Sequence, residues 1–194
     1  MEVIRRSSVF AAGVMEAFDH SPSDKELVSQ SKALCRDYIH SRLNLYGLGS
    51  SKTQLSQCYP VSNCSALWSL LVFLGDELEC MRPSVYRNVA RQLNISVAME
   101  TTVSDAFVAV ATEILSAGIT WGKVVSMYAV AGALAVDCVR QNQPATVQTI
   151  VDSLGQFVRK NLAPWLKKRG GWVSDWTVIV AGLLLLTKGQ FFVL

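Results

Sequence analysis

Between Val124 and Val136 the chain runs for thirteen residues without a charge (VVSMYAVAGALAV), and this run constrains the fold more than any other feature. Thirteen helical residues span roughly 20 Å, which is less than the hydrocarbon core of a bilayer. Lys123 precedes the run, and Asp137 follows it directly. We therefore expect a central helix that is buried inside a soluble core.

The overall composition agrees with extensive burial. Hydrophobic residues make up 51% of the 194 residues and charged residues 17%, whereas charged residues usually approach a quarter. The length favours one domain with a sizeable core. The net charge is +3, and the longest basic run is residues 167–169. So mild an excess does not indicate a nucleic-acid-binding protein.

Residues that carry catalysis or bind metals are scarce. The five cysteines form no CxxC pair, which favours a reducing compartment over a disulfide framework or a zinc site. Two histidines are too few for an ordinary metal cluster. Neither a glycine-rich phosphate loop nor a nucleophile elbow occurs. We therefore predict that the chain is not an enzyme and needs no cofactor or metal.

Helical periodicity recurs along the chain, and strand-like alternation is scarce. Ser23 and Glu26 fit a capping box, and the helix that they begin is stopped near Gly47. Further helices are predicted over about 63–81, 84–93, 103–117, 120–142 and 145–163, with a short one after Pro164. Residues 46–62 are expected to form a flexible loop. The predicted fold is all-α, a globular bundle of about seven to eight helices around the central one.

The C-terminal segment is apolar again. Residues 176–194 contain one lysine, Lys188, and are just long enough to span roughly 30 Å of hydrocarbon. The basic run at 167–169 is expected to stay on the cytosolic side. We expect a helical domain over 1–172 and a membrane anchor over 173–194. The alternative is that this tail folds back into a groove of the domain.

The segment from Leu67 to Leu78 (LWSLLVFLGDEL) predicts an amphipathic helix. Its apolar face carries four leucines at spacings of 4, 3 and 4, namely Leu67, Leu71, Leu74 and Leu78. Gly75 allows close approach of a partner helix, and Asp76 can pair with a cation. A leucine stripe alone would indicate an ordinary core helix. With Gly-Asp-Glu at this register the segment resembles homology region three of the Bcl-2 family, the helix that members insert into a partner's groove.

Residues 118–125 resemble homology region one of the same family, which opens the central helix. Thr120 is a suitable helix cap before Trp121 and Gly122. The family usually has arginine where Lys123 stands here. Lysine can still pair with an incoming aspartate, but it lacks the two-pronged geometry of a guanidinium. Trp121, Gly122 and Lys123 are therefore expected to line a groove.

The segment from Trp165 to Trp172 (WLKKRGGW) resembles homology region two. Gly170 and Gly171 would allow a tight turn between short helices, and the two tryptophans would pack at the end of the groove. Residues 24–43 match region four more loosely. Only four residues, 173–176, separate this motif from the apolar tail, where the family usually has a longer connection.

The resemblance covers most of the chain, and residues 82–93 and 134–141 look most like the pro-apoptotic effector branch. It implies a regulator that exposes its region-three helix, self-associates, and permeabilises the mitochondrial outer membrane or the endoplasmic reticulum. The implied partners are Bcl-2-like proteins, death-promoting helices, a second copy and lipid. The alternative is a pro-survival protein whose groove sequesters death-promoting helices. A third possibility is a tail-anchored adaptor.

Overall fold

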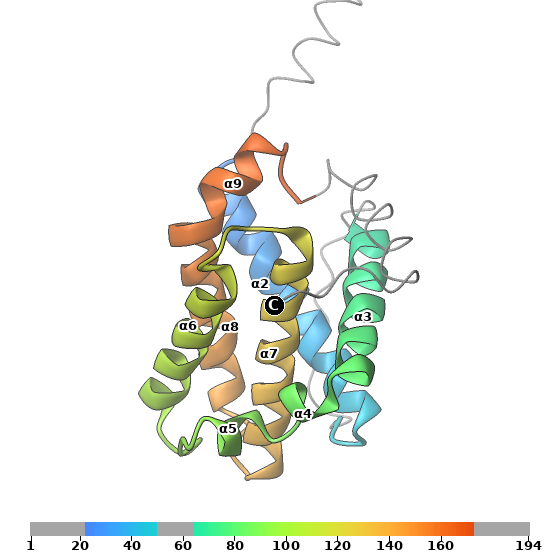
Figure 1. Ribbon diagram of the computed structural model, residues 1–194, viewed down its shortest axis with the longest axis vertical. Coiled ribbons are helices and arrows are strands. Elements are labelled where there is room, and N and C mark those ends of the chain that lie inside the picture. Colours follow the sequence, from blue (N-terminus) through green and yellow to red (C-terminus); the bar gives the residue numbers. More distant parts are fainter. Residues whose placement is uncertain (1–21, 50–63, 173–194) are drawn as a thin grey trace, which may run out of the picture.

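The computed structural model describes residues 22–49 and 64–172, and all regular structure within these two ranges is helical (Figure 1). The elements are α2 (Asp24–Leu45), α3 (Cys64–Met81), α4 (Pro83–Tyr86), α5 (Val89–Gln92), α6 (Glu100–Leu115), α7 (Trp121–Arg140), α8 (Thr146–Phe157), the π-helical turn η1 (Val158–Leu162) and α9 (Ala163–Lys168). The predicted all-α fold is confirmed. The N-terminal 21 residues, most of the predicted loop and the apolar tail lie outside the described residues.

Helix α7 is the centre of the bundle, with α2, α6, α8 and α3 packed around it (Figure 1). Met127, Tyr128 and Leu134 have no exposed surface. This confirms the prediction drawn from the charge-free run. Of the described helices, α7 alone is long and apolar enough to cross a membrane, and 72% of its 18-residue apolar window is buried in the bundle.

Helix α2 begins with the predicted capping box. The backbone N–H of Glu26 donates to the Ser23 hydroxyl at 3.2 Å, and the Ser23 N–H donates to the Glu26 carboxylate at 2.8 Å. Both N–H groups would otherwise lack a partner at the start of the helix. The inner face of α2 consists of buried side chains, among them Leu27, Leu34 and Tyr38.

The single helix predicted over 84–93 is wrong, because α4 and α5 are separate turns. Asn88 lies between them with a φ of 52°, in the left-handed region that asparagine tolerates better than most residues. The carboxylate of Asp137, on α7, accepts the N–H of Ala90 at 2.9 Å. The Gln92 side chain donates to the carbonyls of Ser84 and Arg87, each at 2.6 Å. These side chains bind backbone groups that a continuous helix would have paired internally.

Two other boundaries differ from the predictions. Helix α6 begins at Glu100, three residues before the predicted start, and α8 passes at Val158 into the π-helical turn η1. Asn161 in this turn donates its side-chain amide to the Phe157 carbonyl at 3.1 Å. The turn leads into α9, where Pro164 occupies the first turn, which proline tolerates.

Candidate functional site

The candidate site is helix α3 together with the surfaces that hold it. Its leucine face is turned towards α2 and α7, and the exposed fractions of Leu71, Leu74 and Leu78 are 8%, 7% and 5%. The backbone of Leu67 belongs to α3, but its side chain lies outside the described residues. Phe73, on the other side of the helix, is exposed. The region-three helix is therefore packed against its own domain.

Two glycines bring three helices together around the ring of Tyr38, on α2. A Cβ atom at Gly75 of α3 would lie 2.6 Å from the Tyr38 Cε2 atom, and one at Gly132 of α7 would lie 2.7 Å from its Cε1 atom. Tyr38 is buried, and burial raises its pKa above the ordinary value of a phenol. The close approach expected at Gly75 thus takes place within the chain.

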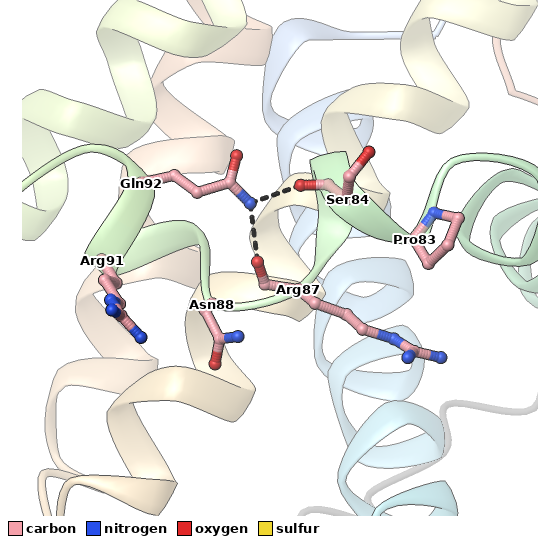
Figure 2. Close-up of a pocket in the computed structure, with 6 residues that line it drawn as sticks. All are labelled: Pro83, Ser84, Arg87, Asn88, Arg91 and Gln92. Atoms are coloured by element: carbon pink, nitrogen blue, oxygen red, sulfur yellow. Dashed lines mark hydrogen bonds between the residues drawn. The ribbon is translucent and has the colours of Figure 1, made fainter.

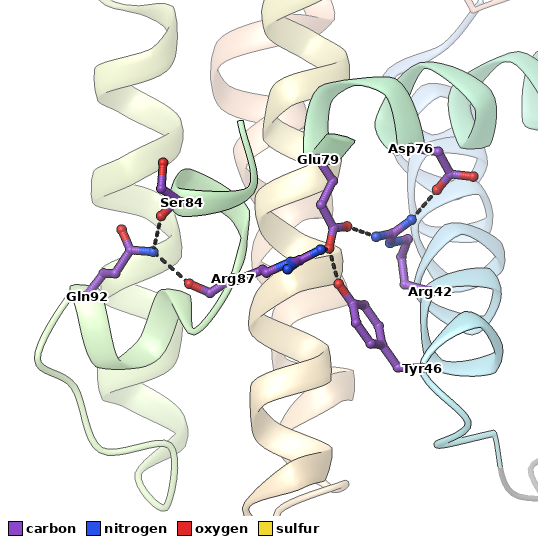
Figure 3. A network of polar contacts seen from close by, with 7 residues as sticks. All are labelled: Arg42, Tyr46, Asp76, Glu79, Ser84, Arg87 and Gln92. Atoms are coloured by element: carbon purple, nitrogen blue, oxygen red, sulfur yellow. Dashed lines mark hydrogen bonds and ion pairs between the residues drawn. The ribbon is translucent and has the colours of Figure 1, made fainter. Parts of the chain in front are cut away.

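Four polar side chains, Arg42, Tyr46, Asp76 and Glu79, join α2 to α3 and are called the Arg42 cluster below (Figure 3). The Arg42 guanidinium binds the Asp76 carboxylate through Nη1 and the Glu79 carboxylate through Nη2. The Tyr46 hydroxyl donates to the second oxygen of Glu79. The exposed fractions of the Arg42, Glu79 and Asp76 side chains are 4%, 12% and 47%, so the Arg42–Glu79 pair is the more buried one.

The Arg42 cluster also reaches α7 and Arg87, the residue that follows α4. The Arg140 guanidinium lies 4.6 Å from the centre of the Tyr46 ring, a distance typical of a cation–π contact. The Arg87 Nε atom lies 4.0 Å from the Glu79 carboxylate, at the limit of an ion pair. Asp76 was expected to pair with a cation on a groove. In this structure its carboxylate is paired with Arg42 of the same chain.

Arg42, Tyr46 and Glu79 were not predicted from the sequence. Arg42 lies 34 residues before Asp76, and no local pattern links the two. One signal was available, because Arg42 falls four residues after Tyr38 on the apolar face of α2. A charged residue on a buried face is expected to be paired.

Regions one and two meet through their tryptophans. The ring centres of Trp121 and Trp165 are 4.9 Å apart in an edge-on arrangement, and those of Trp121 and Trp172 are 5.9 Å apart. The Trp172 indole N–H donates to the Leu27 carbonyl at 3.3 Å. The Arg169 guanidinium covers the Trp165 ring at 4.4 Å. The start of the central helix and the end of the described chain are thereby fastened to α2.

The remaining residues of these motifs differ in their surroundings. Gly170 and Gly171 have φ values of 76° and 91°, so the tight turn uses the left-handed conformations that glycine allows. A Cβ atom at Gly122 would meet nothing within 4 Å. The Lys123 ammonium donates to the Gly118 carbonyl at 3.2 Å, and the Thr120 hydroxyl caps the helix by accepting the Lys123 N–H at 3.3 Å.

Among the residues that the structure describes, no group of three His, Cys, Asp or Glu side chains could hold a metal ion. The predicted absence of a cofactor and of catalysis stays a prediction.

Comparison with known proteins identifies the family. A family model for apoptosis regulator proteins of the Bcl-2 family matches residues 71–172, which is more than half of the chain. The chain belongs to the Bcl-2 family. It is an apoptosis regulator of this family and is closely related to the Bcl-2-related ovarian killer proteins.

Two relatives and one solved structure are similar to this chain over most of its length. The zebrafish Bcl-2-related ovarian killer protein homolog A is 62% identical over 192 residues, covering 93% of this chain and 86% of the relative. The human Bcl-2-related ovarian killer protein is 60% identical over 181 residues, covering 93% and 85%. The crystal structure of chicken BOK matches with a TM-score of 0.72 and 60% identity, covering 81% of this chain and 98% of that one.

A more distant structure shares the fold. Trichoplax adhaerens trBcl-2L2 bound to trBak BH3 matches with a TM-score of 0.70 and 25% identity, over 78% of this chain and 98% of that one.

Proposed function

We propose that this chain is a pro-apoptotic regulator that permeabilises intracellular membranes, after opening of the bundle and self-association. The proposal rests on the composition and the burial of helix α7. It has the length and composition of a membrane-spanning helix, yet it lies at the centre of the bundle. Such a helix can exchange its protein neighbours for lipid when the surrounding helices separate.

The energetics of this exchange depend on the surroundings. In water, exposing α7 costs about 25 cal/mol for each Å² of apolar surface. A bilayer removes most of that cost, so the closed and open states become closer in free energy at a membrane. The charged residues Lys123, Asp137 and Arg140 lie near the two ends of α7, where they can remain in the headgroup region or line a polar pore.

Opening also frees helix α3. When α3 leaves α2, the leucine face with Leu71 and Leu74 loses its cover and becomes able to bind the groove of a second copy. The exposed Asp76 carboxylate loses Arg42 at the same time and can bind a cation on that copy. The contacts that keep α3 on its own domain would thus be replaced by similar contacts between two copies.

The test is dye release from liposomes by the purified full chain. We expect release by the wild type and several-fold less by Leu71→Glu, because a carboxylate in this face would oppose helix burial between copies. Val108→Glu, which adds the same charge on the exposed face of α6, is the matched control. Circular dichroism establishes that each variant is folded. Equal release by all three proteins would refute the proposed mechanism.

The pro-survival alternative has one observation in its favour. The Trichoplax protein with the same fold is bound to a BH3 segment in its solved structure. A pro-survival protein would bind a helical region-three peptide tightly and release little dye. Peptide titration beside the dye-release assay therefore separates the two functions.

The proposed partners are other Bcl-2-like proteins, death-promoting helices, a second copy of the chain and lipid. The proposed locations are the cytosol, the mitochondrial outer membrane and the endoplasmic reticulum, with the tail at 173–194 as the anchor. Cell fractionation of the full chain and of a chain ending at Trp172 tests the anchor. Equal membrane fractions for both chains would exclude it.

A further inference from the structure

A polar pocket lies between α4 and α5, on the segment that follows α3. It has a volume of about 600 Å³ and is lined by Pro83, Ser84, Arg87, Asn88, Arg91 and Gln92. Figure 2 shows the side chains of Arg87 and Arg91 on either side of Asn88. We propose that this pocket, called the α4–α5 pocket below, binds a phosphate-bearing anion, and that the headgroup of an acidic phospholipid is its main source.

The charge of the segment supports an anionic ligand. Between Cys80 and Glu100 the sequence contains three arginines and no acidic residue. Arg82, Arg87 and Arg91 are all exposed. A guanidinium presents several N–H donors in a planar fork, which suits the oxygens of a phosphate. The residues that line the pocket thus offer positive charge and hydrogen-bond donors, and no carboxylate among them competes with an anion.

Two carboxylates on the neighbouring helices, Asp137 and Glu79, have partners outside the pocket. Asp137 on α7 accepts the backbone N–H of Ala90 at 2.9 Å. Glu79 on α3 binds Arg42 and Tyr46, and it lies 4.0 Å from the Nε atom of Arg87. Among the described residues, no carboxylate lies within ion-pair distance of Arg91. Arg91 therefore keeps its positive charge for a ligand, and Arg87 is paired only at the limit of ion-pair distance.

The shape of the pocket is fixed by the backbone around it. Asn88 adopts a left-handed conformation that separates α4 from α5. The Gln92 side chain bridges the carbonyls of Ser84 and Arg87 across the turn, as the dashed lines in Figure 2 mark. These bonds hold the two short helices together, so the backbone positions of Arg87 and Arg91 on either side of Asn88 are fixed before a ligand binds.

A lipid is favoured over a soluble phosphate by exposed apolar residues that neighbour the pocket lining in the sequence. Met81 precedes it and Val85 lies within α4, and both side chains are exposed. Exposed apolar groups next to basic ones suit the boundary between headgroups and acyl chains. A soluble phosphate compound would use the arginines and leave these two side chains in water.

The test compares two double variants that each remove two positive charges. Arg87→Gln with Arg91→Gln alters the pocket, whereas Arg159→Gln with Lys160→Gln alters exposed residues of η1, a turn that adjoins α9. Figure 1 places α9 at the opposite end of the bundle from α5. Binding of the full chain is measured by co-sedimentation with phosphatidylcholine vesicles, with and without phosphatidic acid.

We expect binding to the acidic vesicles to fall about twenty-five-fold in the pocket variant, because each arginine near an acidic surface contributes about fivefold. The η1 variant should bind nearly as well as wild type. An equal loss in both variants would overturn the proposal, since net charge alone would then explain binding. Unchanged binding in the pocket variant would also overturn it.

A second arm uses inorganic phosphate and the side-chain amide NMR signals of Asn88 and Gln92. Shifts in the wild type that are absent from the pocket variant support the site, and phosphate-induced shifts without vesicle binding assign it to a soluble ligand. Equal shifts in both proteins overturn it. The site does not require the proposed permeabilising function, because vesicle binding without dye release would refute that function alone.

Discussion

The buried guanidinium of Arg42 on α2 binds the Glu79 carboxylate of α3, and through its other nitrogen it binds Asp76 one turn earlier. A single cation thus holds two carboxylates of the region-three helix. Both contacts would be lost in the proposed opening, in which α3 leaves α2. The Arg42 cluster therefore adds to the cost of opening the bundle, beside the burial of the leucine face.

Arg42→Met should weaken the attachment of α3. Removing one partner of a buried ion pair typically costs about 3–5 kcal/mol, because the remaining charge is left without a counterion. We expect the lower part of this range, since Asp76 is half-exposed and can be solvated. Urea unfolding measures the loss, and hydrogen exchange should show it first in α3. Arg159→Met, at an exposed position of η1, is the control. Unchanged exchange in α3 would contradict this role of Arg42.

Gly75→Ala and Gly132→Ala should each destabilise the protein. Alanine usually favours a helix over glycine by up to about 1 kcal/mol. Here the added methyl group would overlap the Tyr38 ring, and overpacking of this kind costs about 1–3 kcal/mol. The expected net loss is about 1–2 kcal/mol for either variant, measured by thermal or urea unfolding.

Gly122→Ala is the matched control, because a Cβ atom there meets nothing within 4 Å. It should be neutral or stabilising by up to about 1 kcal/mol. If all three glycines responded alike, the stability changes would reflect helix propensity and not contact with Tyr38.

The Asp152 carboxyl should make stability depend on pH. Burial alone would raise its pKa, but hydrogen bonds from Lys32 and Gln148 outweigh this and hold the pKa below its ordinary value of 3.8. The Lys32 Nζ atom lies 2.6 Å from Oδ1. Because the folded pKa is the lower one, the pair stabilises the fold above 3.8, and this contribution is lost as the pH falls through the folded pKa.

Asp152→Asn should therefore lower the free energy of unfolding at pH 7 and make no difference at pH values below the folded pKa. The expected loss is about 0.5 kcal/mol, because the Asp152 side chain is 44% exposed and solvent screens the pair. Urea unfolding over a pH series gives the comparison. Asp105→Asn removes the same charge from the exposed face of α6 without touching this pair. A difference that persisted undiminished in acid would exclude the ionic origin.

Sequence alone predicted the features that depend on local pattern. The charge-free run at 124–136 became the buried helix, and the Ser23 capping box formed as expected. The leucine spacing placed Leu71, Leu74 and Leu78 on one buried face. Each of these follows from residues close together in the sequence, so the helical period is sufficient to find them.

The features that sequence did not predict depend on contacts between distant segments. The break at Asn88 is supported by a carboxylate of α7, 47 residues after the N–H of Ala90 that it accepts. The partner of Asp76 is Arg42, on a separate helix. The pairing of the tryptophans of regions one and two joins residues more than 40 positions apart. Helical periodicity carries no information about such contacts, because it specifies which face is apolar but not what covers it.

Two cysteines on adjoining helices should report opening of the bundle through their reactivity. Cys80 on α3 is exposed, whereas Cys35 on α2 is buried, and burial raises the pKa of the Cys35 thiol to about 12 although Arg36 opposes the shift. The thiolate is the reactive form, so iodoacetamide should label the buried Cys35 far more slowly than the exposed Cys80 in the closed protein. Peptide mass spectrometry after timed labelling gives the two rates, and the urea-unfolded chain, in which they should converge, is the control.

On liposomes that release dye, we expect the rate at Cys35 to rise, because the proposed opening uncovers α2. Dye release with Cys35 still protected would mean that α2 stays packed, and the membrane-active state would then have to form without the separation of α3 from α2.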